Sequence, residues 1–213
     1  SMKPYYETKL GKLYLGDAKE VLQSLDENSV DLVITDPPYS RKYFYTYSYL
    51  SDYCPRLMKR GSSLLTIAPS YVLPEVIELF KNKLKFRWII SLDTSSGKHP
   101  RLKMGIEVVW KPILWYVKES FALNKYNGYI KDSVKIENTD GQIKKLHRWQ
   151  QSEDWCYYLI KRLSLENEVV LDPFIGSGTV AAVCEKLNRR WIGIDIDEES
   201  CKTTIYRLNS FYI

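Results

Sequence analysis

The sequence predicts a doubly wound α/β fold around one mixed sheet, mostly parallel with an antiparallel edge hairpin. Two observations lead to this fold class. Short β-rich apolar runs alternate with segments of helical periodicity along most of the chain. One run, residues 30–34, is almost wholly apolar, which is typical of a strand covered on both faces of a parallel sheet.

Residues 1–117 supply five strand runs and three helical segments. An apolar run at 13–15 ends at Gly16, and the further expected elements are a helix at 18–25, a strand at 30–34, a helix at 50–59 stopped by Gly61, a strand at 63–68 and a helix at 74–83. Residues 86–92 and 108–117 are apolar and β-rich, and we expect them to pair as antiparallel edge strands.

The second half begins with a polar, turn-rich stretch and then returns to alternation. Residues 118–147 show weak periodicity and are interpreted as a short insertion within a single domain over 1–213. The later expected elements are a helix at 152–164, a strand at 168–171, a helix at 179–187, a strand at 191–196 and a helix at 199–208.

Composition restricts the class of protein. The 213 residues are 45% hydrophobic and 27% charged, which suits one globular domain with a buried core. No membrane span and no secretory leader are expected, so the predicted location is the cytoplasm, and Ser1 before Met2 is interpreted as a cloning remnant. Four scattered cysteines and two histidines predict no metal site, and the net charge of +5 weakly favours a polyanionic partner. A homodimer is left open.

A glycine-rich loop at 172–179 follows a strand run and opens a helix. Glycines there let a ligand approach the backbone and the helix N-terminus. The spacing is neither that of a dinucleotide fingerprint nor that of a phosphate loop, which favours a ligand without phosphates. Seventeen residues after Gly178, Asp195 ends the next strand run, where such folds hold ribose hydroxyls.

A second loop, Asp36-Pro37-Pro38-Tyr39, follows the strand at 30–34. Two prolines cannot continue a strand ladder, so the loop leaves its carboxyl end. A carboxylate and a carbonyl held by proline can both accept hydrogen bonds from an NH₂ group, and an aromatic ring can stack on a flat base. A base amino group is a poor nucleophile because its lone pair is delocalised, and two acceptors on its protons would free that lone pair.

Together these strings resemble the amino-methyltransferases of DNA, in the permuted beta class whose catalytic motif precedes the cofactor motif. The resemblance implies a class I fold dependent on S-adenosylmethionine (SAM), a Rossmann-like architecture, with DNA as partner and a flipped-out target base. It implies catalysis by Asp36, Pro37, Pro38 and Tyr39. It also implies a set of cofactor-binding residues, namely Asp17, Asp172, Phe174, Gly176, Ser177, Gly178, Thr179 and Asp195.

The sequence departs from the family pattern at one place. Relatives usually carry His-Pro-x-Gln-Lys-Pro before the helix that precedes the cofactor strand, whereas this chain has His147-Arg148-Trp149-Gln150-Gln151-Ser152. The missing Lys-Pro pair affects the expected contacts to the methionine end of the cofactor.

The resemblance favours adenine N6 over cytosine N4 as the target, because family members acting on cytosine more often begin the catalytic motif with Ser. RNA methylation and a non-catalytic SAM- or DNA-binding subunit are the other interpretations. Residues 118–147 are the expected target-recognition region. The expected nucleic-acid contacts are Arg41, Lys42, Lys98, His99, Arg101 and Lys103.

Overall fold

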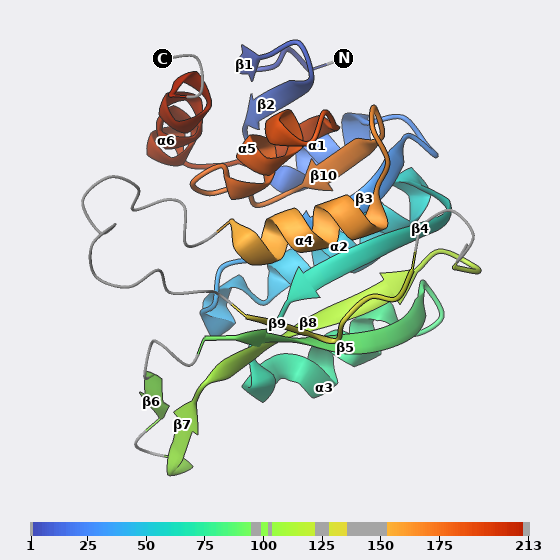
Figure 1. Ribbon diagram of the computed structural model, residues 1–213, viewed down its shortest axis with the longest axis vertical. Coiled ribbons are helices and arrows are strands. Elements are labelled where there is room, and N and C mark those ends of the chain that lie inside the picture. The colour runs from blue at the N-terminus through green and yellow to red at the C-terminus, as the bar shows by residue number, and fades with distance from the viewer. Residues whose placement is uncertain (1, 95–98, 102–103, 122–127, 136–152, 211–213) are drawn as a thin grey trace.

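The computed structural model describes residues 2–94, 99–101, 104–121, 128–135 and 153–210, with the side chains of 99–101 left aside. The principal feature is a nine-stranded sheet of order β1-β2-β11-β10-β3-β4-β8-β5-β9 (Figure 1). Its strands are β1 (Tyr6–Glu7), β2 (Gly11–Leu15), β3 (Val30–Thr35), β4 (Met58–Ile67), β5 (Lys85–Asp93), β8 (Trp110–Val117), β9 (Ser133–Lys135), β10 (Val169–Asp172) and β11 (Arg190–Asp195).

The central strands of the sheet are parallel, and one strand beyond them, β8, runs in the opposite direction. Strands β2, β11, β10, β3 and β4 run in the same direction, and β8 runs antiparallel to both β4 and β5. The expected antiparallel pair is therefore present, but β8 is an interior strand. The outer edge on that side is β9, which pairs parallel with β5.

Within the described residues, six α-helices cover the two faces of the sheet. They are α1 (Ala18–Ser24), α2 (Tyr45–Leu57), α3 (Leu73–Phe80), α4 (Asp154–Leu163), α5 (Thr179–Lys186) and α6 (Glu198–Asn209). Figure 1 shows α4 in front of the sheet and α2 and α3 behind it. Aspartates cap two of these helices, Asp17 by accepting from Lys19 N and Asp197 by accepting from Ser200 N, which satisfies amides that lack helical partners.

Alternation along the strands divides the core between the two faces. Leu32 and Ile34 of β3 face one cluster with residues of α4, α5 and α6, whereas Val33 faces a second cluster with residues of α1, α2 and α3. All six residues of β3 are buried, as the continuous apolar run predicted. None of the described helices is both long enough and apolar enough to cross a bilayer.

The helix expected at 50–59 was placed too late in the chain. Helix α2 begins at Tyr45, and residues from Met58 onward already belong to β4. The buried face of α2 includes two polar side chains, Thr46 and Ser51, so apolar periodicity under-reported its first turns. Lys59 was expected at the end of the helix, where a basic residue is common. In the structure it belongs to β4, and its Nζ lies 3.0 Å from Oδ1 of the buried Asp31.

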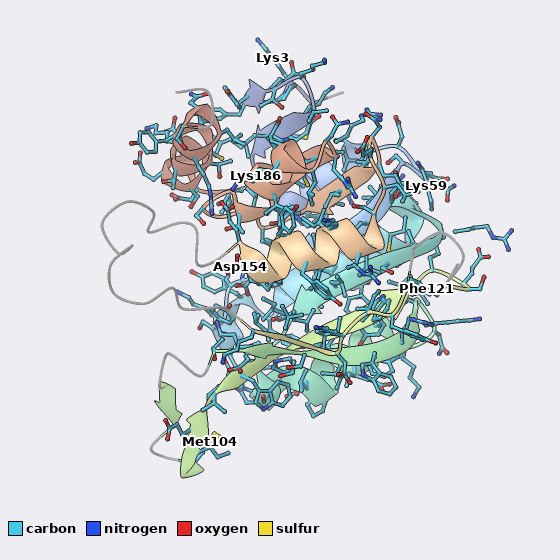
Figure 2. The ribbon with its side chains drawn as sticks, viewed as in Figure 1. Lys3, Lys59, Met104, Phe121, Asp154 and Lys186 are labelled. Atoms are coloured by element: carbon cyan, nitrogen blue, oxygen red, sulfur yellow. The ribbon has the colours of Figure 1, made fainter. Side chains whose placement is uncertain are left out.

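The glycine-bounded segment at 97–105 is more structured than the loop that was expected. A two-stranded hairpin pairs β6 (His99–Arg101) with β7 (Ile106–Val108). Met104 lies near its tip, 60% exposed and away from the main sheet (Figure 2). Of the predicted insertion at 118–147, the structure describes 118–121 and 128–135, which contain β9, and the remainder lies outside the described residues.

Candidate active site

The two loops singled out in the sequence leave neighbouring strands. Strands β10 and β3 pair in parallel, with Leu171 opposite Val33. The chain winds outward on both sides of this pair, to β11 beside β10 and to β4 beside β3, so their carboxyl ends form a topological switch point. Thr35, the last residue of β3, donates from Oγ1 to Asp172 Oδ1 at 2.6 Å. The loops at 36–39 and 172–179 therefore start side by side, although 136 positions separate Asp36 from Asp172.

The glycine loop turns tightly against β11. Asp172 accepts from Phe174 N at 3.1 Å, and Ile175 N donates to Ile194 O at 2.9 Å. Gly176 and Gly178 have φ values of +53° and +80°, a region that favours glycine. A methyl group added at Gly176 would have Phe174 O, at 4.0 Å, as its nearest neighbour, so open space lies beside this backbone and a ligand can approach it.

Asp195 holds the glycine loop and lies at the end of its own strand, as predicted. Its Oδ2 accepts from Gly176 N and its Oδ1 from Asp197 N, both at 2.9 Å. Its backbone carbonyl accepts from Gly16 N at 2.9 Å, which brings the neighbouring Asp17 to the same edge of the sheet. Each carboxylate oxygen has further acceptor capacity, so a ribose hydroxyl can be accommodated without breaking these bonds.

A buried ionic network that the sequence analysis missed supports the loop from below. The Arg207 guanidinium, 3% exposed, donates to Ser177 O at 3.2 Å and to Thr179 Oγ1 at 2.8 Å. It also pairs with Glu153 Oε1 at 2.7 Å, and Lys186 contacts the other oxygen of the same carboxylate. Charged residues near the ends of amphipathic helices are usually solvated, so no sequence signal set Arg207 or Glu153 apart.

The loop at residues 36–39 carries the predicted catalytic motif, and we refer to it by that prediction as the catalytic loop; hydrogen bonds of two tyrosines hold it together. Tyr39 OH donates to Asp36 Oδ2 at 2.5 Å, and the Tyr39 carbonyl accepts from Tyr71 OH at 2.5 Å. Pro37 is buried, whereas Pro38 and Tyr39 are exposed. The loop thus carries the Asp36 carboxylate, a hydrogen-bonded carbonyl at Tyr39 and the exposed Tyr39 ring, just after the end of β3.

Two side chains from other elements complete this part of the site, and neither was identified from the sequence. Lys111 Nζ lies 3.0 Å from Tyr39 OH and 4.3 Å from the centre of the Tyr39 ring. Tyr47 of α2 is buried and donates to Ile67 O at 3.0 Å, and its own pKa is raised by burial and by the charge of Asp36. Only the tertiary structure relates these residues to the loop.

Three carboxyl groups at the carboxyl ends of β3, β10 and β11 have pKa values above the ordinary value for aspartate. Burial of the carboxyl group raises the pKa of Asp36, although the residue as a whole is exposed, and the Tyr39 hydrogen bond and the Lys111 charge oppose the rise. Burial raises the pKa of Asp172 to about 7 and also raises that of Asp195. Clusters of acids with perturbed pKa values are typical of functional centres.

The expected nucleic-acid contacts are only partly described. Arg41 lies 3.5 Å from Glu75, and Lys42 lies 4.7 Å from the centre of the Tyr43 ring, both beside the catalytic loop. His99 and Arg101 belong to β6, but their side chains are not described. Lys98, Lys103 and the departure from the family pattern at 147–152 lie outside the described residues.

Comparison with known proteins gives a family match over most of the chain. Residues 30–206 match the N6/N4 methylase family, described as DNA methylase. The chain belongs to this family. The predicted family is thereby confirmed, including its two target classes, adenine N6 and cytosine N4.

Individual relatives of the DNA methylase are distant in sequence. The type II methyltransferase M.HpaI of Haemophilus parainfluenzae is 28% identical, with 93% of this chain and 74% of the relative aligned. M.BamHI of Bacillus amyloliquefaciens is 27% identical and covers 92% of this chain, but the chain spans only 56% of its length. Some relatives therefore contain substantial sequence with no counterpart here.

Solved structures confirm the class I methyltransferase fold. The PvuII DNA methyltransferase, named as cytosine-N4-specific, superposes with a TM-score of 0.80 at 21% identity over 96% of this chain and 88% of its own. The complex of M1.HpyAVI with SAM gives 0.71 at 24% identity over 94% of this chain and 100% of its own. The expected Rossmann-like mixed sheet is the fold that all three share.

Proposed function

We propose that this methylase transfers the methyl group of SAM to the exocyclic N6 nitrogen of a flipped-out adenine in DNA. The observation that carries the proposal is the joining of the two loops at the switch point by the Thr35–Asp172 hydrogen bond. This hydrogen bond holds the start of the loop at 36–39 beside the start of the glycine loop, and we assign the first to the base amino group and the second to a nucleoside-like cofactor.

The cofactor site would be formed by the glycine loop and two acids. The open space beside Gly176 admits a ligand close to the backbone, and Asp195 has acceptor capacity for ribose hydroxyls. Asp17 would lie beside the adenine, and Phe174, which is half-buried, would border the methyl group. SAM, when bound, supplies an electrophilic methyl group on sulfur. The SAM complex of a structural relative is consistent with this assignment.

The catalytic loop would bind and orient the amino group. The Asp36 carboxylate and the Pro37 carbonyl would each accept a hydrogen bond from one N–H of the amino group, which favours a tetrahedral nitrogen. The Tyr39 ring would stack on the base. In this arrangement the nitrogen lone pair would be free to form the bond to the methyl carbon, and the electrons of the broken S–C bond would remain on sulfur. One amino proton would then pass to the Asp36 carboxylate and from there to water.

Adenine is preferred because the catalytic motif begins with Asp36, whereas cytosine-acting members of the family more often begin with Ser. The family spans both targets, and PvuII methyltransferase is named for cytosine N4, so cytosine is the second candidate. The hairpin β6–β7 with its flanking cations, and residues 118–147, would contact the DNA.

The test is methylation of duplex DNA, single-stranded DNA and RNA with labelled SAM, followed by nucleoside analysis. We expect N6-methyladenine from DNA. N4-methylcytosine, or label found only in RNA, would replace the substrate assignment, and no label in any nucleic acid would overturn the enzymatic proposal.

A substitution separates catalysis from cofactor binding. Asp36→Ala should abolish transfer while calorimetric titration shows SAM affinity largely retained, because Asp36 belongs to the base side of the site. Asp26→Ala, which removes an exposed carboxylate at a distant turn, is the matched control and should leave both unchanged. Near-normal turnover in Asp36→Ala would contradict the role given to this carboxylate.

A further inference from the structure

The reversed strand β8 brings its first residues to the active edge of the sheet. Because β8 runs antiparallel to β4, its amino end lies at the carboxyl ends of the parallel strands. Ala68 N, just after β4, donates to Pro112 O at 3.1 Å and fixes this end of β8 in place. Lys111 precedes that anchor, which explains how a lysine 72 positions from Tyr39 reaches the catalytic loop.

The contacts form a short relay from Lys111 to Asp36. The Lys111 ammonium lies 3.0 Å from the Tyr39 hydroxyl, and that hydroxyl donates to Asp36 Oδ2 at 2.5 Å. The Tyr39 hydroxyl therefore donates to the same carboxylate that we propose accepts from the base amino group. A carboxylate in its ionised form can accept there, whereas a protonated carboxyl would itself be a donor at one oxygen.

We propose that Lys111 is a positioning residue for methyl transfer, which holds the Asp36 carboxylate ionised, through the Tyr39 hydroxyl and through its own charge, and so ready to accept from the base amino group. The inference rests on the proposed function for its catalytic consequence. The effect of Lys111 on the protonation of the Asp36 carboxyl group can be measured without a substrate.

Several groups besides Lys111 lie around Asp36, and none of those named below opposes protonation of its carboxylate with a positive charge. Tyr47 from α2 and Asp172 from β10 both interact with the Asp36 charge, and Tyr71 contacts Tyr39 from η2 (Ser70–Val72). A tyrosine side chain carries no positive charge, and an ionised Asp172 would repel a second carboxylate. Among the described residues that shift the pKa of Asp36, Lys111 supplies the positive charge.

The experiment uses three substitutions at Lys111 and one control. Lys111→Met removes charge and hydrogen bond, Lys111→Gln keeps a polar group but no charge, and Lys111→Arg keeps the charge. Lys85→Met removes an exposed lysine at the other end of β5, which pairs with β8, and is the matched control. Titration of the Asp36 carboxyl by carbon NMR, assigned with Asp36→Asn, and the pH profile of single-turnover methylation are measured for each.

We expect Lys111→Met and Lys111→Gln to move the Asp36 titration and the acid limb of the rate profile together toward higher pH. Each unit of displacement would lower the rate on the acid side about tenfold relative to the plateau. Lys111→Arg and Lys85→Met should keep both midpoints. A uniform loss of rate with unmoved midpoints would show a merely structural role and overturn the inference. A wild type that methylates no nucleic acid would instead overturn the proposed function, and the NMR arm would still decide the hold of Lys111 on Asp36.

Discussion

The two glycines with left-handed backbone in the glycine loop provide a quantitative test of the packing around this loop. At Gly178, with φ +80°, an added Cβ would lie 2.7 Å from Thr204 Cγ2, 2.8 Å from its Oγ1 and 3.0 Å from its Cα. At Gly176, with φ +53°, an added Cβ would meet nothing closer than 4.0 Å. Alanine substitutions at the two positions therefore share the backbone strain but differ in steric conflict.

The expected magnitudes follow from these distances. Left-handed backbone costs a non-glycine residue about 1–2 kcal/mol, which applies to both variants. Gly178→Ala adds an overpacking cost of about 2 kcal/mol, because both the side chain and the backbone of Thr204 in α6 must move. For a chain of this size that difference corresponds to a Tm about 4–8 °C lower than that of Gly176→Ala.

The assay is urea unfolding and calorimetric melting of both variants, with SAM titration on each. Gly176→Ala should be the more stable variant and yet lose SAM affinity, because its methyl group enters the space assigned to the ligand. Combining Gly178→Ala with Thr204→Ala should lower the cost of the glycine substitution, since two of the three close contacts disappear. Equal destabilisation by the two single variants would refute the close approach of α6 to the loop.

Two further predictions concern buried charges. Arg207→Met should destabilise the fold by about 3–5 kcal/mol, because it leaves the buried Glu153 carboxylate with fewer partners, and Glu153→Gln in the same chain should recover part of the loss in urea unfolding. At Asp172, burial raises the pKa to about 7 in the folded chain from 3.8, so the folded state holds the extra proton between these values and its stability falls as pH rises through them. Asp172→Asn keeps an acceptor for Thr35 and should remove a slope of at most about 1.4 kcal/mol per pH unit, and an unchanged slope would contradict the raised pKa.

Local sequence was sufficient for most of the fold. The buried strand β3, the glycine turn before α5 and the acid at the end of β11 were all placed correctly, because each depends on residue types within a few positions of one another. The start of α2 was missed where polar residues form part of its buried face. The antiparallel pair of β5 and β8 was expected at the edge of the sheet, and the structure instead has β9 outside β5, a pairing that depends on a distant segment.

The candidate site divides in the same way. The sequence by itself determined the two motifs, their order and the strands that they follow, since these are properties of contiguous residues. Tertiary structure alone decided that Lys111 reaches Tyr39 from a reversed strand and that Arg207 with Glu153 supports the glycine loop. Such contacts join positions 28 to 72 residues apart, and the energy of a charge depends on what surrounds it in space rather than on its neighbours along the chain.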